Sequence, residues 1–439
     1  MAQPQAPITL TIDNLTSDGD GVGRMGREVC FVPGALPGEQ VLVRLQGRRK
    51  KVWQGRLLDV QQASADRRTP PCPHYQRCGG CDLQHMDEAA QLAFKQQRVE
   101  REFSRQGIPV REWLPAITGP HWHYRRKARL GVRFSKEQQR NFIGFREASS
   151  EHLTDIDRCQ ILPEHPLYDW SAWRDLIAGL RGRDIITQIE TLDTDNALAL
   201  VIRVLKPLAV DDCQTLLGFV QMHSAGRVVQ VWLNHGRDKP MECLWPEHPQ
   251  PLLHEVDGVS LVMQPDDFIQ VNGAVNRQMV QQAMEWLAPQ ENDLIWDLFA
   301  GHGNFSIPLA RRCRSVLAVE GQATMVSSLQ AQAERLALSL HAEVADLAGE
   351  GALSRLPTPD KVLLDPPRAG AAEAVREVIA RKVPQVLYVS CDAATLARDL
   401  THLIAAGYQA DKAGIMDMFP QTHHVETMVL LSRKGKRNG

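Results

Sequence analysis

Apolar and polar positions alternate over the first 60 residues, in short runs separated by glycine and proline. The run at 8–15 ends in the turn-rich stretch SDGDGVGRMG, and three further runs follow it: REVCFVPG, EQVLVRLQ and VWQGRLLDV. Alternation with period two, bounded by turn residues, is typical of strands that bury one face. We therefore predict five short strands that form a small β-barrel of the oligonucleotide-binding kind over residues 1–65.

The pattern changes after this barrel. Residues 66–85 contain two proline-rich turns and a glycine pair, which predict a loop, whereas 87–106 have the apolar spacing of an amphipathic helix. Beyond that helix, strand-like and helix-like runs are mixed in no regular order. We expect a central α+β domain over residues 66–270.

Strand-like and helix-like runs alternate regularly from residue 271 onward. The strand-like runs are DLIWDLFA, SVLAVE, LHAEVAD, KVLLDP and QVLYVSC. Apolar strands separated by helices of ordinary length are typical of a parallel, doubly wound sheet. The sequence therefore predicts an α/β protein whose residues 271–439 form a Rossmann-like domain.

Composition narrows the class of protein. Hydrophobic residues make up 43% and charged residues 23% of the 439 positions, which excludes a wholly disordered chain. The formal net charge is −2, so binding to nucleic acid must depend on local basic clusters such as 48–51, beside Trp53, and 125–127. No apolar run is long enough for a membrane span, and the first residues do not resemble a signal peptide. We expect a monomer in the cytoplasm.

A glycine turn follows the first strand of the Rossmann-like region. The stretch DLFAGHGNF begins at Asp297, and the next strand ends at Glu320. Glycines at such a turn let a ligand approach the backbone, and a carboxylate after the next strand can accept both ribose hydroxyls. Ser306 stands where a dinucleotide-binding fingerprint has its third glycine, which favours S-adenosylmethionine over NAD. Asp346 closes the third strand and is expected near the adenine.

A second motif, Asp365-Pro366-Pro367-Arg368, follows the fourth strand. Two prolines make a rigid loop, which directs the Asp365 carboxylate toward the cleft. Methyltransferases that modify amines carry an aromatic residue after the prolines. Arg368 takes that place here, so the motif disfavours an amine as the methyl acceptor.

Two further residues match the chemistry of methylation at carbon. Cys391 lies between a buried strand and a helix start, where we expect the helix dipole to favour the thiolate, and Glu426 precedes the last strand. Carbon 5 of uracil becomes nucleophilic when a thiolate adds to carbon 6, and a base must later remove the proton from carbon 5. We predict Cys391 as the nucleophile and Glu426 as the general base.

Three of the nine cysteines, Cys72, Cys78 and Cys81, lie close together in the 66–85 loop. Three thiols in a loop rich in proline and glycine suit either a tetrahedral zinc ion or an iron–sulfur cluster, with Cys159 as the expected fourth ligand. Their spacing alone does not distinguish the two, and His74 and His85 are further candidates for zinc.

In combination, these motifs resemble those of the RNA uracil-5 methyltransferases. The resemblance rests on DLFAGHGNF, DPPRAG, the Ser-Cys pair at Cys391, HHVE at Glu426 and FIQVN at 268–272, with a TRAM-like barrel and the cysteine loop before them. It implies 23S rRNA as the substrate and a helix near 90–120 that packs on the catalytic domain. It also implies a [4Fe–4S] cluster, rather than zinc, on Cys72, Cys78, Cys81 and Cys159. Contacts to S-adenosylmethionine are implied for Gln270, Phe299, Asn304, Glu320, Asp346 and Asp365.

Two other functions fit parts of this pattern. One is an RNA-binding ribosome-assembly factor that keeps a vestigial methyltransferase fold, which the two basic clusters would serve. The other is methylation of a different RNA uridine by the same chemistry. The presence of both Cys391 and Glu426 argues against a vestigial site.

Overall fold

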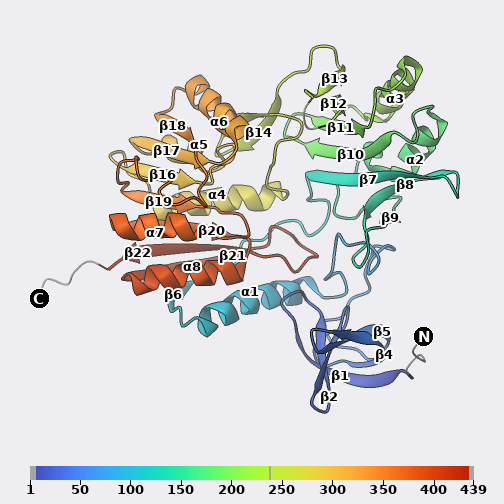
Figure 1. Ribbon diagram of the computed structural model, residues 1–439, viewed down its shortest axis with the longest axis horizontal. Helices are drawn as coiled ribbons and strands as arrows, with labels where there is room; N and C mark the ends of the chain where they lie inside the picture. The colour runs from blue at the N-terminus through green and yellow to red at the C-terminus, as the bar shows by residue number, and fades with distance from the viewer. Residues whose placement is uncertain (1–5, 237–238, 435–439) are drawn as a thin grey trace, which may run out of the picture.

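The computed structural model describes residues 6–236 and 239–434, which form a barrel, a central domain and a catalytic domain (Figure 1). The predicted fold class is confirmed. No helix in this described part of the chain is both long and apolar enough to cross a lipid bilayer.

The barrel closes in the order β1-β2-β3-β5-β4. Its strands are β1 (Ile8–Leu15), β2 (Gly21–Met25), β3 (Glu28–Val32), β4 (Gln40–Arg49) and β5 (Val52–Gln62). Alternate residues point inward, so Leu10, Ile12 and Val43 meet in its small core. The fifth strand, β2, lies inside the turn-rich stretch SDGDGVGRMG, where glycines at 21 and 23 allow close packing: a Cβ at Gly21 would lie 2.8 Å from the Ala35 carbonyl oxygen.

The central domain is built on a seven-stranded sheet in the order β13-β12-β11-β10-β7-β8-β9. The strands are β7 (Lys127–Ser135), β8 (Arg140–Arg146), β9 (Leu153–Asp155), β10 (Ile186–Asp193), β11 (Leu198–Val204), β12 (Val229–Asn234) and β13 (Glu242–Trp245). Trp170 and Trp173 of helix α2 (Trp170–Gly179) and Leu216 of α3 (Val210–His223) are fully buried in its core. A short 3-10 turn, η1 (Pro166–Tyr168), precedes α2, and a separate hairpin of β14 (Leu252–Val256) and β15 (Val259–Met263) leads to the catalytic domain.

The catalytic domain contains an eight-stranded sheet in the order β18-β17-β16-β19-β20-β22-β21-β6. The strands are β6 (Val110–Trp113), β16 (Leu294–Leu298), β17 (Ser315–Glu320), β18 (Leu340–Val344), β19 (Lys361–Leu364), β20 (Gln385–Ser390), β21 (Tyr408–Met416) and β22 (Glu426–Arg433). Strands β16 to β20 are parallel, whereas β22 runs antiparallel to β20 and β21. Every carboxyl end of the parallel strands therefore lies at one edge of the sheet.

Helices cover both faces of this sheet (Figure 1). Buried side chains of α4 (Gly273–Leu287), α5 (Ser306–Ala310) and α6 (Ala323–Arg335) share one core. Those of α1 (Glu88–Arg105), α7 (Ala372–Arg381) and α8 (Ala393–Ala405) share the other. Helix α1 and strand β6 precede the central domain in the sequence but pack against α8 and pair with β21, so the chain enters the catalytic domain twice.

Candidate active site

Two cavities open at the edge where the parallel strands of the catalytic sheet end. Loops after β16, β17 and β19 line the smaller cavity, of about 490 Å³. The larger, of about 630 Å³, lies between this edge and the loop that carries Cys72, Cys78 and Cys81. The two cavities share four lining residues: Phe268, Gln270, Asp365 and Pro367. A molecule in one can therefore meet a molecule in the other.

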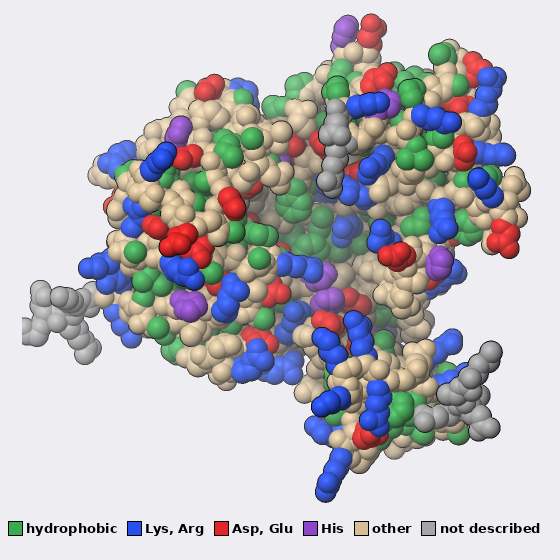
Figure 2. Space-filling view, viewed as in Figure 1, with side chains coloured by type: hydrophobic (Ala, Val, Ile, Leu, Met, Phe, Trp, Pro, Cys, Tyr) green, Lys and Arg blue, Asp and Glu red, His purple; other side chains and the backbone are tan. Residues whose placement is uncertain are grey.

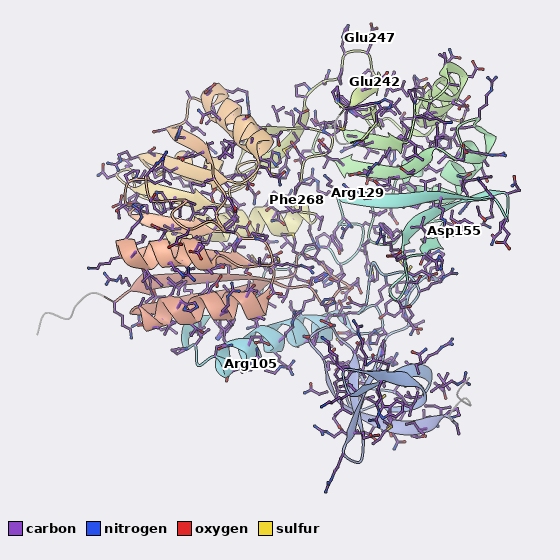
Figure 3. All side chains as sticks on the ribbon, in the orientation of Figure 1. Arg105, Arg129, Asp155, Glu242, Glu247 and Phe268 are labelled. Carbon is purple, nitrogen blue, oxygen red and sulfur yellow. The ribbon has the colours of Figure 1, made fainter. Side chains whose placement is uncertain are left out.

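Phe268 lies at this junction, between the catalytic sheet and the central domain (Figure 3). Its side chain is 58% exposed although it is large and apolar. The space-filling view shows a hollow at the same place, with apolar side chains in its floor and Lys, Arg and His side chains around it (Figure 2). A hollow of this composition suits a ligand with a flat ring and a charged backbone.

All six residues expected to contact the methyl donor line the smaller cavity. They come from five different segments around the carboxyl edge of the catalytic sheet and are Gln270, Phe299, Asn304, Glu320, Asp346 and Asp365. Parallel strands explain the convergence, because residues that follow neighbouring strands lie at the same edge. Asn304 is held in place by two hydrogen bonds with Asn276, at 2.9 and 3.0 Å between amide nitrogen and oxygen.

The glycine turn after β16 is tightly curled. Phe299, Gly301 and Gly303 all have positive φ, of 66°, 55° and 96°. A Cβ on Gly303 would lie 2.6 Å from a methyl carbon of Leu329, and any other residue would be strained at this φ. Glu320 stabilises the turn, since one of its carboxylate oxygens accepts the Gly301 N–H at 3.2 Å.

Asp297, the first residue of the glycine motif, has a different role from its neighbours. It is 1% exposed, does not line either cavity, and accepts a hydrogen bond from the Ser306 hydroxyl. Burial, with a smaller effect of the carboxylates of Asp365 and Glu320, raises its pKa to about 7. Asp297 therefore stabilises the glycine turn from its buried side, away from both cavities.

Cys391 and Glu426 both line the larger cavity, as Arg368 and Asp365 do. Cys391 follows β20 and is partly exposed, whereas Glu426 begins β22 and is 7% exposed. Strands β20 and β22 are neighbours, and Ser390 pairs with Thr427, so the thiol and the carboxyl group lie at the same place on the sheet edge. The structure thus brings together the two residues that the sequence predicted to act on carbon 5 and carbon 6 of uracil.

Their ionisation differs from what the sequence predicted. Burial, followed by the charge of Glu426, raises the pKa of Cys391 to about 11, and Arg368 opposes this shift. The expectation that the helix dipole lowers the pKa of this thiol was wrong for the protein without substrate. The Asp392 carboxylate already accepts the N–H groups of Ala394 and Thr395 at the start of α8. The partial positive charge of this helix end is therefore satisfied by Asp392 and not by Cys391.

The pKa of Glu426 is also shifted from its ordinary value. Burial first, and the neighbouring carboxylate of Asp365 second, raise its pKa to about 8, while Arg368 acts in the opposite direction. A carboxyl group with a pKa in this range accepts a proton readily at neutral pH and releases it again. In the sequence, Arg368 was notable only because it replaces an aromatic residue. In the structure its positive charge opposes the rise in pKa of both Cys391 and Glu426.

The four predicted cluster ligands, Cys72, Cys78, Cys81 and Cys159, line the wall of the larger cavity. Burial raises the pKa of Cys78 and Cys81 above the ordinary value and that of Cys159 to about 11, and each of these thiols is affected by the charge of its neighbours. Across residues 6–236 and 239–434, however, no three His, Cys, Asp or Glu side chains form a group that could hold a metal ion.

The two basic clusters are only partly free for a ligand. In the first, the Arg48 guanidinium lies 4.6 Å from the centre of the Trp53 ring, and the Trp53 indole N–H donates to Glu28 at 2.8 Å. One face of the expected stacking platform is therefore covered. In the second, Arg126 pairs with Asp195 at 3.1 Å, whereas Arg125 lines the larger cavity.

The motif that ends at Glu426 pointed to the loop between β21 and β22, but no role was predicted for Phe419, Thr422, His423 and His424, which line the larger cavity. Nor was a role predicted for the fully buried Lys95, which contacts this loop from α1. The available signal was a lysine three residues after Leu92 and four before Val99, on the apolar side of the expected helix.

Comparison with known proteins identifies the family. The model of the TRAM domain matches residues 6–58, and that of the tRNA (Uracil-5-)-methyltransferases matches residues 255–351 and 352–434. A protein of Shewanella sp. strain ANA-3 named 23S rRNA (uracil(1939)-C(5))-methyltransferase RlmD is 40% identical over 438 residues, which cover 98% of this chain and 96% of that protein. A protein of the same name from Alcanivorax borkumensis is 37% identical and covers 99% and 98%.

Among solved structures, the chain is similar to the Pyrococcus abyssi tRNA (uracil-54, C5)-methyltransferase in complex with S-adenosyl-L-homocysteine. The TM-score is 0.74 at 22% identity, and the match covers 97% of this chain and 100% of that one. This likeness supports the fold. The full-length relatives and the matching family model show that the chain belongs to the RNA uracil-C5 methyltransferase family, as its motifs predicted.

Proposed function

We propose that this protein transfers the methyl group of S-adenosylmethionine to carbon 5 of a uridine in 23S rRNA. One observation carries the proposal: the thiol of Cys391 and the carboxyl group of Glu426 line one cavity, which joins the cavity lined by all six predicted donor contacts. The relatives named for uracil 1939 suggest that position as the target.

The first step of the proposed mechanism belongs to Cys391. Its thiol loses a proton to water, and the positive charge of Arg368 favours the resulting thiolate. The thiolate then bonds to carbon 6 of the uracil ring, and the electron pair of the 5,6 double bond moves toward carbon 5 and the ring carbonyl. Because the thiol has a raised pKa before substrate binds, this step is favoured at alkaline pH.

The second and third steps exchange the substituents of carbon 5. Carbon 5 attacks the methyl carbon of the donor, whose bond to sulfur breaks, and S-adenosylhomocysteine is formed. The Glu426 carboxylate then takes the proton from carbon 5, and the electrons of that C–H bond re-form the double bond and expel Cys391 as thiolate. The raised pKa of Glu426 suits this acceptance of a proton from carbon.

We assign the donor contacts to Gln270, Phe299, Asn304, Glu320, Asp346 and Asp365. The cavity that they line has the glycine turn on one side, where the backbone allows a close approach, and the Glu320 carboxylate, suited to ribose hydroxyls, beside it. Gln270 and Asp365 also line the larger cavity, so the methyl group would point across this shared boundary toward the uracil.

We assign RNA binding to the barrel, which ends near residue 65, and to the central domain, which ends near 270 and does not include α1 and β6. Lys and Arg side chains gather over the visible face of the barrel beside the hollow (Figure 2). Such side chains neutralise phosphates, while the target base must leave its stack to reach Cys391. A monomeric state and a cytoplasmic location stay predictions.

We further propose a [4Fe–4S] cluster on Cys72, Cys78, Cys81 and Cys159. The residues fit this group: four partly buried thiols, three from the 72–81 loop and one from the central domain, line one wall of the larger cavity. When bound, the cluster would tie the 72–81 loop to the central domain.

Protein purified without oxygen is expected to be brown, with broad absorption in the blue that disappears on oxidation. The Cys81→Ser variant should lose most of this absorption, whereas Cys243→Ser, a partly buried cysteine on β13 outside the cavity, should keep it. Colourless protein that contains zinc by metal analysis would contradict the assignment of the cluster.

The proposed function is tested by incubating the full chain with a 23S rRNA fragment and donor labelled in its methyl group. We expect the label in 5-methyluridine after digestion to nucleosides and mass spectrometry. Label on a base nitrogen, or RNA binding without any transfer, would contradict the proposal and favour amine methylation or an assembly factor, respectively.

A further inference from the structure

Helix α1 carries a lysine that is completely buried. The side chain of Lys95 is 0% exposed and that of its partner Asp417 is 2% exposed, with 2.6 Å between the ammonium nitrogen and Oδ1. The same ammonium donates to the carbonyl oxygen of Phe419 at 3.0 Å. A well-packed apolar pair is often as stabilising as a buried ion pair, so stability alone does not explain why charge is used here.

The acceptors of Lys95 lie in the loop of residues 417–425, which we call the base loop. It joins β21 to β22 and ends at Glu426, the first residue of β22. Glu426 pairs across the ladder with Met416, which directly precedes Asp417. Lys95 therefore fixes the chain next to the cross-strand partner of the general base.

Neighbouring turns of α1 hold the rest of the same loop. The Gln91 amide donates to the side chain of Gln421 at 3.0 Å and accepts the Gln421 N–H at the same distance. The Arg98 guanidinium donates to the His423 carbonyl oxygen at 2.9 Å. Residues 91, 95 and 98 lie on one side of the helix, so α1 presents a row of donors that follows the base loop.

We propose that Lys95 is a positioning residue for Glu426: its two bonds to the base loop set the place of the carboxylate that removes the proton from carbon 5. This inference rests on the proposed function. Cys391 does not lie in the base loop: it follows β20 and directly precedes Asp392, the residue that caps α8. Loss of Lys95 should therefore impair the removal of the proton and leave the addition of the thiolate intact.

The Lys95→Met variant tests this separation of steps. We expect kcat to fall about tenfold to a hundredfold, since a displacement of about 1 Å can have an effect of this size, while KM for the RNA stays within about twofold. With 5-fluorouridine RNA there is no proton on carbon 5, so the covalent adduct forms without the base. Its rate of formation should match that of the unchanged protein, and a covalent adduct with ordinary RNA should accumulate.

Lys361→Met is the matched control. Lys361 also contacts one carboxylate and one carbonyl oxygen, Asp293 at 2.9 Å and Ala288 at 2.6 Å, but at the amino end of β19, away from both cavities. This variant should lose thermal stability without accumulating an adduct. A double variant, Lys95→Met with Asp417→Leu, removes both buried charges. We expect its melting temperature to recover while kcat stays low.

Two results would overturn the inference: equal loss of turnover and of 5-fluorouridine adduct in Lys95→Met, or recovery of kcat together with stability in the double variant. Should Lys95→Met fail to fold, the double variant and Lys95→Arg give the same comparison of kcat with adduct formation. If the unchanged protein forms no adduct with 5-fluorouridine RNA, the proposed function itself fails, and that result is distinct from the two above.

Discussion

Replacement of Cys391 by alanine is expected to lower methyl transfer to 23S rRNA by at least about 10⁴-fold, because loss of a covalent nucleophile removes the whole reaction path. Without the bond to carbon 6, carbon 5 of uracil has too little electron density to attack the methyl group. The measurement is transfer of labelled methyl groups to a 23S rRNA fragment under single-turnover conditions.

Donor binding should survive this replacement. Cys391 lines the larger cavity and not the donor cavity, so calorimetry should give a dissociation constant for S-adenosylhomocysteine within about twofold of the unchanged protein. Cys313→Ala, at a partly buried cysteine beside β17 and outside both cavities, is the control and should retain activity. Methyl transfer by Cys391→Ala at more than about a hundredth of the normal rate is incompatible with the proposed chemistry.

Replacement of Glu426 by glutamine is expected to stop the reaction one step later. The amide cannot take the proton from carbon 5, so turnover should fall about 10²–10⁴-fold. The methyl group should still be transferred, since neither the thiolate attack nor the transfer needs the base. Methylated RNA should therefore remain bonded to Cys391 and run with the protein on a denaturing gel.

Because this variant lacks the charge of Glu426, the pH dependence of adduct formation should change. Glu426 raises the pKa of Cys391, so its removal should shift adduct formation with 5-fluorouridine RNA toward lower pH. In the unchanged protein the base must be ionised, and with a pKa of about 8 the rate should increase as pH rises from about 6.5 to 8.5. Glu334→Gln, on the exposed side of α6, should alter neither property. Normal turnover by Glu426→Gln would show that another group removes the proton.

Much of the active site follows from local sequence patterns. The strand-like runs placed Glu320 at the end of a parallel strand and Asp365 and Cys391 directly after two others, and the topology of such sheets brings these positions to one edge. The glycine turn was evident for a similar reason, because only glycine fits the positive φ at position 303 beside Leu329. These features depend on residues close in sequence or on a rule of topology.

Other features depend on contacts between distant segments. Strand β21 contains lysine and aspartate among its apolar residues, and β6 is short, so neither had a clear strand pattern. Burial of Cys391 beside Glu426 reversed the pKa shift that the helix start suggested, and burial is a property of the packed molecule. The place of Lys95 on the apolar side of α1 indicates a buried lysine, but its partner Asp417 lies 322 positions away and is not evident from the sequence near either residue.

The covalent bond between Cys391 and the uracil ring is tested most directly by mass spectrometry of the complex with 5-fluorouridine RNA. After digestion with protease and nuclease, we predict one modified peptide, which contains residue 391 and carries the mass of a methylated fluorouridine nucleotide. A nucleotide on any other residue, or methylated RNA recovered with no modified peptide at all, would contradict the account.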